Sequence, residues 1–289
     1  MKVALIQKKY FANKKKTVKK TVGDIKKASL EGAKLIVLQE LHQNEYFCQS
    51  EETKYFVYAN DWEEDLKFWG KVAKKYSVVL VTSLFEKRTA GLYHNTAVVF
   101  DKDGSIAGKY RKMHIPDDPG FYEKFYFTPG DLGFEPIETS VGKLGVLICW
   151  DQWYPEAARI MTLKGAEILI YPTAIGWFEE DSKEERKRQL RSWVNIQRSH
   201  AIANGVAVLS CNRVGFEQDS SKVMDGIRFW GNSFVCDPQG EIIAKAGKKE
   251  CILYAEIDNE RTKEVRDIWP FLRDRRIDAY ADLLKRYCD

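Results

Sequence analysis

The sequence of 289 residues predicts an α/β protein. Short apolar runs, many rich in β-branched residues, alternate with longer amphipathic segments, a pattern typical of helices packed on a largely parallel sheet. The second half of the chain repeats the pattern of the first. The composition, 44% hydrophobic and 30% charged, is that of a globular protein long enough to bury a substantial core.

Four strands are expected in the first half, each a short apolar run that ends at polar or turn-forming residues. A lysine-rich amphipathic segment follows the first of them and predicts a helix that ends near residue 33. A second helix is predicted near residues 61–76. The strands are expected at residues 3–7, 35–38, 78–84 and 96–100.

The second half has the same order of elements. The most apolar run, residues 144–150, is far shorter than the roughly 18 to 20 apolar residues that a membrane-spanning helix needs, so no membrane partner is expected. Strands are expected at residues 144–149, 168–171, 206–210 and 233–236, and helices at residues 155–164 and 182–204.

A local sequence match supports a duplication. Asn95 begins the segment Asn-Thr-Ala-Val, which leads to a DxxG turn at Asp101, and Asn232 begins Asn-Ser-Phe-Val, which leads to a similar turn at Asp237. Both read as a strand, a tight turn and a strand. Chance similarity between two common hairpins is the alternative. Because no Ser/Gly linker divides the chain, we expect residues 1–289 to form a single domain.

The C-terminal residues 261–289 form a charged and aromatic tail that includes Trp269. We expect an apolar tail of this kind to lie at a subunit interface. Packing of the tail on its own domain is the alternative.

The formal charge of +4 is distributed unevenly. Residues 1–34 contain eleven lysines against Asp24 and Glu31, so the rest of the chain is net negative. The lysine cluster at residues 14–20 is interpreted as a solvated helix face, since no aromatic or arginine residue is interleaved with it, and no nucleic-acid partner is expected. The six cysteines show no CxxC pair, and no signal segment is apparent, so reduced thiols in the cytoplasm are expected.

Cys149 is a candidate nucleophile. It ends the apolar run 144–149, so a buried strand would deliver it into a strand-to-helix turn where backbone N–H groups can hold an oxyanion. Cysteine is intrinsically nucleophilic, and a nearby cation lowers its pKa. A buried core cysteine is the alternative interpretation.

A cysteine nucleophile needs a base, and the chain has four histidines. His42 and His114 follow polar residues at strand ends, whereas His94 precedes a strand and His200 lies in a predicted helix. A cysteine–histidine pair is therefore an open alternative that no spacing supports.

Glu40 and Lys112 are two further candidates. Glu40 follows the apolar strand 35–38, at the edge where α/β enzymes place their sites, and desolvation there would raise its pKa to suit a general base. Lys112 lies where a strand runs into a loop and could act as a fixed cation beside a thiolate or an oxyanion. A helix cap or solvated acid at Glu40, and a solvated charge at Lys112, are the alternatives.

In this order and in these strand contexts, Glu40, Lys112 and Cys149 resemble the Glu-Lys-Cys triad of the nitrilase superfamily of carbon–nitrogen hydrolases. The resemblance covers essentially the whole chain. Within the superfamily, residues 112–134, 145–177 and 197–217 look like the branch that hydrolyses N-carbamoylputrescine.

The resemblance implies an αββα sandwich with internal pseudo-duplication that pairs with a second subunit, so a homo-oligomer is expected. It also implies that Glu40 is the general base, Lys112 the cation that stabilises the oxyanion, and Cys149 the nucleophile. Glu123 matches a second glutamate that orients the lysine, and the backbone N–H of Trp150 would complete the oxyanion hole. The resemblance implies no metal and no organic cofactor.

The substrate that the resemblance implies is a small carbamoyl amine. Relatives that hydrolyse N-carbamoyl amino acids carry arginines just after the cysteine, whereas this chain has Gln152 and Trp153, which favours a cationic substrate such as N-carbamoylputrescine. The alternatives are an N-carbamoyl amino acid amidohydrolase such as β-ureidopropionase, an aliphatic amidase and a nitrilase. Aromatic and acidic residues near the motifs are candidates for holding the substrate: Tyr46, His114, Trp150, Trp177, Glu179 and Glu180.

Overall fold

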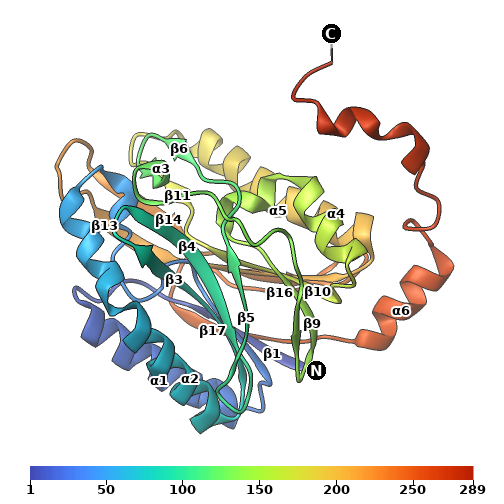
Figure 1. Cartoon of the computed structure of the whole chain (residues 1–289), viewed down its shortest axis with the longest axis horizontal. Coiled ribbons are helices and arrows are strands. Elements are labelled where there is room, and N and C mark those ends of the chain that lie inside the picture. Colours follow the sequence, from blue (N-terminus) through green and yellow to red (C-terminus); the bar gives the residue numbers. More distant parts are fainter. Residues whose placement is uncertain (289) are drawn as a thin grey trace.

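The computed structural model describes residues 1–288, and its two large sheets with flanking helices confirm the α/β class expected from the sequence. Figure 1 shows the sheets in the middle of the molecule. Helices α1 (Lys14–Leu30) and α2 (Trp62–Tyr76) lie on one side, and helices α4 (Pro155–Leu163) and α5 (Lys183–Asn204) lie on the other (Figure 1).

The first sheet has six strands, and its central strands β1, β2 and β3 run parallel. Helix α1 joins β1 to β2, and α2 lies between β2 and β3, because parallel neighbours need crossover connections. The two edges are antiparallel. In spatial order the strands are β17 (Cys251–Glu256), β1 (Lys2–Gln7), β2 (Leu35–Leu38), β3 (Val79–Thr89), β4 (Leu92–Phe100) and β5 (Ile106–Arg111).

The second sheet also has six strands, with β9, β10 and β12 parallel at its centre. Helix α4 connects β9 to β10, and α5 precedes β12. Ser182 caps the start of α5 by accepting the Glu185 N–H, and Gly205 ends it in the left-handed conformation. The strands, in order, are β16 (Ile242–Lys245), β15 (Phe234–Cys236), β12 (Ala207–Asn212), β10 (Ile168–Thr173), β9 (Gly142–Val146) and β8 (Ile137–Thr139).

The two halves repeat one order of connections, in which two strand–helix crossovers are followed by two antiparallel strands. The two DxxG turns occupy equivalent places. Gly104 donates its N–H to the carbonyl of Asp101 between β4 and β5, and Gly240 donates to Asp237 between β15 and β16. Both glycines have a φ near +80°, a conformation that other residues rarely adopt.

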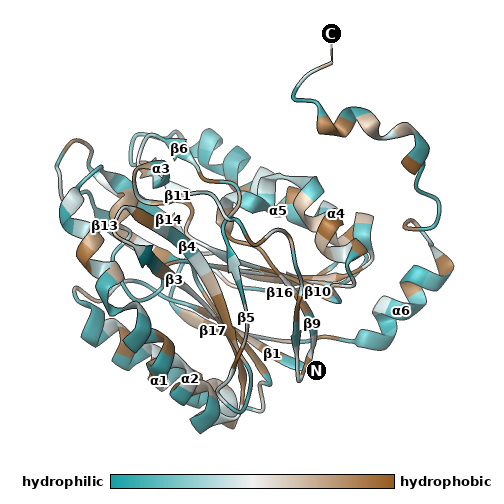
Figure 2. Ribbon diagram, viewed as in Figure 1, coloured by the Kyte–Doolittle hydropathy of each residue, from teal (hydrophilic) through white to brown (hydrophobic). Residues whose placement is uncertain are grey.

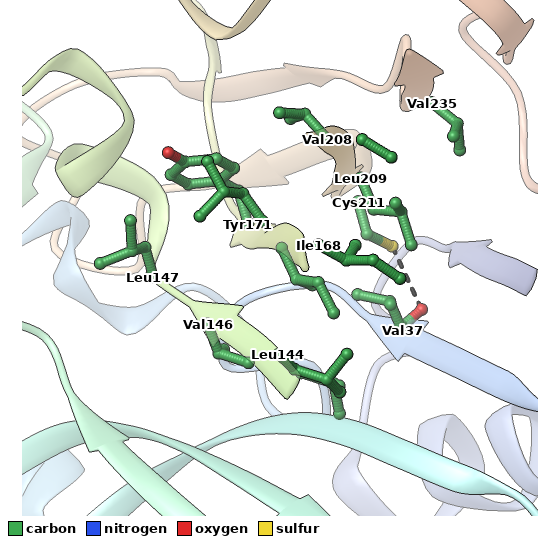
Figure 3. Close-up of a cluster of buried hydrophobic side chains, with 14 of the residues drawn as sticks. Val37, Leu144, Val146, Leu147, Ile168, Tyr171, Val208, Leu209, Cys211 and Val235 are labelled. Atoms are coloured by element: carbon green, nitrogen blue, oxygen red, sulfur yellow. Dashed lines mark hydrogen bonds between the residues drawn. The ribbon is translucent and has the colours of Figure 1, made fainter. Parts of the chain in front are cut away.

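The two sheets pack face to face. Leu5 and Val37 of the first sheet share a buried cluster with Val146 and Ile168 of the second, and Figure 3 shows part of this cluster. Cys211 spans the gap, since its Sγ lies 3.4 Å from the carbonyl oxygen of Val37. Because side chains alternate along a strand, the neighbouring residues of β1 and β2 point the other way and pack against α1 and α2.

Short elements gather beyond the carboxyl ends of the parallel strands, where they build the walls of the site described below. Their aromatic side chains form a separate buried cluster around Phe47. These elements are β6 (Asp117–Asp118), β7 (Phe121–Tyr122), α3 (Glu123–Tyr126), β11 (Gly176–Trp177), β13 (Val214–Gln218), β14 (Gly226–Trp230) and the 3-10 helices Phe47–Gln49, Thr53–Asp61 and Cys149–Trp153.

Beyond helix α6 (Asn259–Ile268), the chain leaves the body as an extended arm, residues 269–288 (Figure 1). Two short 3-10 helices, Ile277–Ala279 and Ala281–Leu284, lie in the arm, and several of its apolar side chains are exposed. The ribbon of the arm includes hydrophobic stretches, coloured brown in Figure 2. Within residues 1–288, no helix has the length and apolar character that crossing a membrane requires.

Candidate active site

Cys149 lies at a sharp turn beyond the carboxyl end of β9. It begins a 3-10 helix, Cys149–Trp153, and its backbone has a φ of +41°, a left-handed conformation that is strained for cysteine. Only 5% of the residue is exposed, and its Sγ lies 3.8 Å from the carbonyl oxygen of Ala174. The strand-to-helix turn expected from the sequence is therefore present, as a tight elbow.

Glu40 lies just beyond β2 and is completely buried. Its Oε1 accepts hydrogen bonds from Asn95 Nδ2 and from Lys112 Nζ, each at 2.7 Å. Its Oε2 accepts no hydrogen bond from any residue in the range 1–288. One carboxylate oxygen is thus fixed by two donors, and the other is free to take a proton.

Lys112 follows the last residue of β5 and is also completely buried. Its Nζ lies 2.7 Å from Glu40 Oε1 and 2.6 Å from Glu123 Oε2, so one ammonium group bridges two carboxylates. Tyr46 holds the second carboxylate by donating its hydroxyl to Glu123 Oε1 at 2.8 Å. An ion pair buried to this degree is stable only where its donors and acceptors are satisfied in this way.

Burial decides the protonation of the cluster. Desolvation raises the pKa of Glu40 to about 7, against the lowering effect of Lys112, so this carboxyl titrates near neutral pH. Desolvation also raises the pKa of the Cys149 thiol, and Glu40 adds to the rise. Burial alone would lower the pKa of Lys112, but Glu123 and Glu40 raise it above its usual range. The neutral thiol of Cys149 therefore lies beside two groups: Glu40, which can accept its proton, and Lys112, which keeps its positive charge.

A cavity of about 460 Å³ leads to this cluster and is lined by Cys149 and Glu123 at its buried end. Its walls are largely aromatic and include Trp150, Phe121, Trp153, Phe178 and Trp230. At its more exposed end lie three carboxylates and a single basic side chain, contributed by Asp118, Asp181, Glu185 and Arg188.

Of the residues predicted to hold the substrate, only Trp150 lines this cavity. Tyr46 reaches the cluster, but through Glu123. Trp177 is buried beside Trp230, with ring centroids 5.2 Å apart. Glu179 is bound instead to Arg228, whose Nε lies 2.6 Å from its Oε1. Proximity in the sequence therefore placed these residues near the cavity without placing them in its wall, and Glu180 does not line it either.

His114 supports the turn that carries Cys149. Its Nδ1 lies 2.7 Å from Asp151 Oδ1, and its ring stacks on Tyr154 with centroids 3.8 Å apart. Asp151 also accepts hydrogen bonds from the Tyr110 hydroxyl and the Ile148 N–H. His114 thus ties the loop after Lys112 to the elbow, and it is absent from the cavity wall.

The other histidines make their contacts elsewhere. His94 Nδ1 pairs with the carbonyl of Thr128, and His200 Nε2 pairs with the carbonyl of Gln152. His42 is buried against Trp69, and desolvation lowers its pKa to about 3. The ionisable groups that act on the Cys149 thiol are Glu40, Lys112 and Glu123, so the structure does not contain the alternative cysteine–histidine pair.

The sequence offered little indication of several residues that complete the site. Asn95, which donates to Glu40, stands out in the sequence only as part of a repeated strand segment. Asp118, Asp181 and Glu185 lie in polar stretches that resemble any solvated loop or helix start. Their common feature, a place on the cavity wall, depends on the folded chain.

Comparisons with known proteins agree with this geometry. Residues 2–267 match the carbon-nitrogen hydrolase family. The chain is 42% identical to an N-carbamoylputrescine amidase of Arabidopsis thaliana, over 90% of this chain and 87% of the relative, and 40% identical to a citrullinase of Francisella tularensis, over 99% of each. The crystal structure of a carbon-nitrogen hydrolase from Helicobacter pylori superposes with a TM-score of 0.98 and 63% identity, covering 100% of this chain and 99% of that one. The chain therefore belongs to the carbon–nitrogen hydrolase family of the nitrilase superfamily and is an amidohydrolase that acts on carbon–nitrogen bonds.

Proposed function

We propose that the enzyme hydrolyses N-carbamoylputrescine to putrescine, carbon dioxide and ammonia. The observation that carries the proposal is the acidic outer part of the cavity, which is lined by Asp118, Asp181 and Glu185 and by a single basic residue, Arg188. The guanidinium of Arg188 lies 3.3 Å from Glu185 and is itself paired. A net negative opening above an aromatic wall attracts an organic cation and offers its ammonium group both carboxylates and ring faces. The 42% identity to a plant N-carbamoylputrescine amidase supports the same substrate.

The first half of the proposed reaction forms a covalent intermediate. Glu40 takes the proton of the Cys149 thiol, and the sulfur attacks the carbamoyl carbon. Lys112 Nζ and the Trp150 N–H stabilise the oxyanion, and Glu123 keeps the ammonium of Lys112 in place. Glu40 then returns the proton to the terminal nitrogen, which leaves as ammonia when its bond to carbon breaks.

In the second half, water replaces the sulfur. Glu40 takes a proton from the water as the oxygen attacks the thiocarbamate carbon, and the carbon–sulfur bond breaks to restore the Cys149 thiol. The product is the carbamic acid of putrescine, which loses carbon dioxide to give the free amine. A pKa near 7 lets Glu40 serve as base and as acid in the same cycle.

Citrulline is a second candidate substrate. It carries the same terminal carbamoyl group, but its other end bears an amino group and a carboxylate. Glu185 and Arg188, one turn apart on α5, present both complementary charges at the cavity. The citrullinase of Francisella tularensis is 40% identical over nearly the full length of both chains.

A substrate panel combined with two substitutions separates the candidates. The purified enzyme is assayed for ammonia release with N-carbamoylputrescine, citrulline, N-carbamoyl-β-alanine and simple amides. We expect the highest kcat/KM for N-carbamoylputrescine, a loss of roughly 10-fold in Glu185→Gln, and little loss in Arg188→Gln. Glu184→Gln, which alters an exposed neighbour outside the cavity wall, is the matched control.

The opposite pattern would change the substrate. A higher kcat/KM for citrulline than for N-carbamoylputrescine, lost in Arg188→Gln, would identify citrulline as the substrate. Turnover of N-carbamoyl-β-alanine without N-carbamoylputrescine would refute a cationic substrate but leave the reaction class unchanged.

A further inference from the structure

A buried ion pair lies outside the reacting cluster, where the chain passes from β12 to β13. Arg213 is completely buried, and its Nη1 lies 2.6 Å from Glu217 Oε1. Neither residue lines the cavity that reaches Cys149. Burying an arginine costs free energy unless its N–H groups find hydrogen-bond partners. The partners of the Arg213 guanidinium therefore indicate which part of the structure the ion pair supports.

The Nη2 group of Arg213 points at the turn that follows β2. Its Nη2 donates to the carbonyl oxygens of Leu41 at 2.8 Å, Asn44 at 3.1 Å and Glu40 at 3.3 Å. Leu41 has a φ of +46°, which a leucine adopts only when its surroundings impose it. The planar guanidinium therefore holds together the bent backbone from which the Glu40 side chain extends.

Glu217 continues the connection to the second carboxylate. Its Oε2 accepts the backbone N–H of Tyr46 at 2.7 Å, and the hydroxyl of the same tyrosine donates to Glu123 Oε1 at 2.8 Å. One ion pair from the second half of the chain is thus linked to both carboxylates that bind Lys112. The link to Glu40 crosses 173 residues of sequence.

We infer that the Arg213–Glu217 ion pair is a positioning device that aligns Glu40 and Glu123 around Lys112. The inference rests on the proposed function only in assigning these three residues to catalysis, and it does not depend on the substrate. Arg213 acts through the backbone of the turn at Glu40, and Glu217 acts through Tyr46. Displacement of either carboxylate would weaken both proton transfer at Cys149 and the placement of the Lys112 ammonium.

The substitution Arg213→Lys tests the inference because lysine keeps the charge but loses the planar fork. We expect kcat to fall roughly 10- to 100-fold, whereas KM stays within about 2-fold because the cavity wall is unchanged. The acidic limb of the pH–rate profile should move to higher pH, since a displaced Glu40 loses part of its contact with Lys112. A loss of stability alone would not move that limb.

Two variants serve as comparison. Arg198→Lys is the matched control, because Arg198 also donates to a backbone carbonyl, that of Gly240 at 2.7 Å, away from the site. It should keep the wild-type kcat and pH profile. Glu217→Gln weakens the same ion pair from its other side. It should lower kcat and move the acidic limb of the pH–rate profile to higher pH, each by less than Arg213→Lys does. The folding of each variant is checked by circular dichroism. If Arg213→Lys does not fold, Glu217→Gln provides the test.

A second readout needs no substrate. The rate of Cys149 alkylation by iodoacetamide is followed against pH, with the modified peptide identified by mass spectrometry. We expect Arg213→Lys to slow alkylation and to shift its pH dependence upward. If wild-type enzyme hydrolyses no carbamoyl substrate but the alkylation profile shifts, the substrate proposal fails and the positioning inference stands. Wild-type kcat and alkylation profiles in folded Arg213→Lys or Glu217→Gln enzyme would overturn the inference.

Discussion

The carboxylate of Asp151 accepts a 2.8 Å hydrogen bond from the backbone N–H of Ile148 and thereby closes the turn around Cys149. The same side chain is completely buried and binds the backbone N–H and ring of His114 in the loop that follows Lys112. A single carboxylate thus ties the strained cysteine elbow to the segment that carries the cation. We therefore expect Asp151 to hold the elbow and the loop in place, without itself taking part in the reaction.

We expect Asp151→Asn to lower both stability and kcat. The amide nitrogen cannot accept the hydrogen bonds that one carboxylate oxygen accepts, and an unsatisfied buried donor costs about 1–3 kcal/mol of unfolding free energy. Chemical denaturation and steady-state kinetics measure the two effects. Asp103→Asn, at an exposed turn, should change neither. Wild-type stability in Asp151→Asn would contradict the prediction.

The pH dependence of kcat/KM should show an acidic limb near pH 7. Burial raises the pKa of Glu40 to about 7, and a general base works only when deprotonated, so the rate should fall as the pH falls through that value. Glu40→Gln should reduce kcat by a factor of roughly 100 or more and remove the limb from any residual rate. A flat profile between about pH 5.5 and pH 8 would argue against Glu40 as the base.

Cys149→Ser should abolish ammonia release while leaving the fold intact. A serine hydroxyl is a far weaker acid than a thiol, and a loss of at least roughly 1,000-fold in kcat is expected. Cys288→Ser, at an exposed site in the arm, should retain full activity. Significant turnover by Cys149→Ser would assign the nucleophile elsewhere.

We propose that the C-terminal arm, residues 269–288, docks on a second copy of the chain. Its exposed large apolar side chains form an uncovered surface that a closed homo-oligomer would bury. They are Trp269, Phe271, Ile277, Tyr280, Leu283, Leu284 and Tyr287. Light scattering should report an oligomer for the full chain.

Changing Leu283 and Leu284 together to Asp should lower the molecular mass measured by light scattering, because two charges cannot be buried at an apolar interface without partners. Changing the exposed pair Arg273 and Asp274 together to Ser is a control within the same arm and should leave the mass unchanged. A monomeric full chain would contradict the proposal, and so would an oligomer that tolerates the two aspartates.

The residues predicted for catalysis converge because each follows a strand. Glu40 lies two residues beyond β2 and Cys149 three residues beyond β9, both parallel strands. In this fold the carboxyl ends of the parallel strands of both sheets meet, since the Glu40 N–H donates to the carbonyl of Thr173 at the end of β10. Lys112 follows the hairpin strand β5 and reaches the same place. The local pattern of apolar runs marked these residues as candidates, and the resemblance to the nitrilase superfamily singled them out. Neither gave their distances.

The residues predicted to hold the substrate did not converge in the same way, and the cause is strand pairing. Trp177 lies opposite Arg228 in the pairing of β11 with β14, so Arg228 is available to bind Glu179. Two segments about fifty residues apart decide this contact. No periodicity or spacing within either segment predicts it.

The sequence by itself determined the α/β class, the repeated order of strands and helices, and the family, because these depend on local periodicity and on motifs read along the chain. Only the tertiary structure decided which groups surround the triad. Asn95 and Tyr46 bind the carboxylates of Glu40 and Glu123, and Arg213 holds the turn at Glu40 from the other half of the chain. Asn95 reaches Glu40 from another strand of the same sheet, whereas Arg213 follows a strand of the other sheet. These contacts depend on strand pairing and on the packing of the chain, which no local pattern of residues encodes.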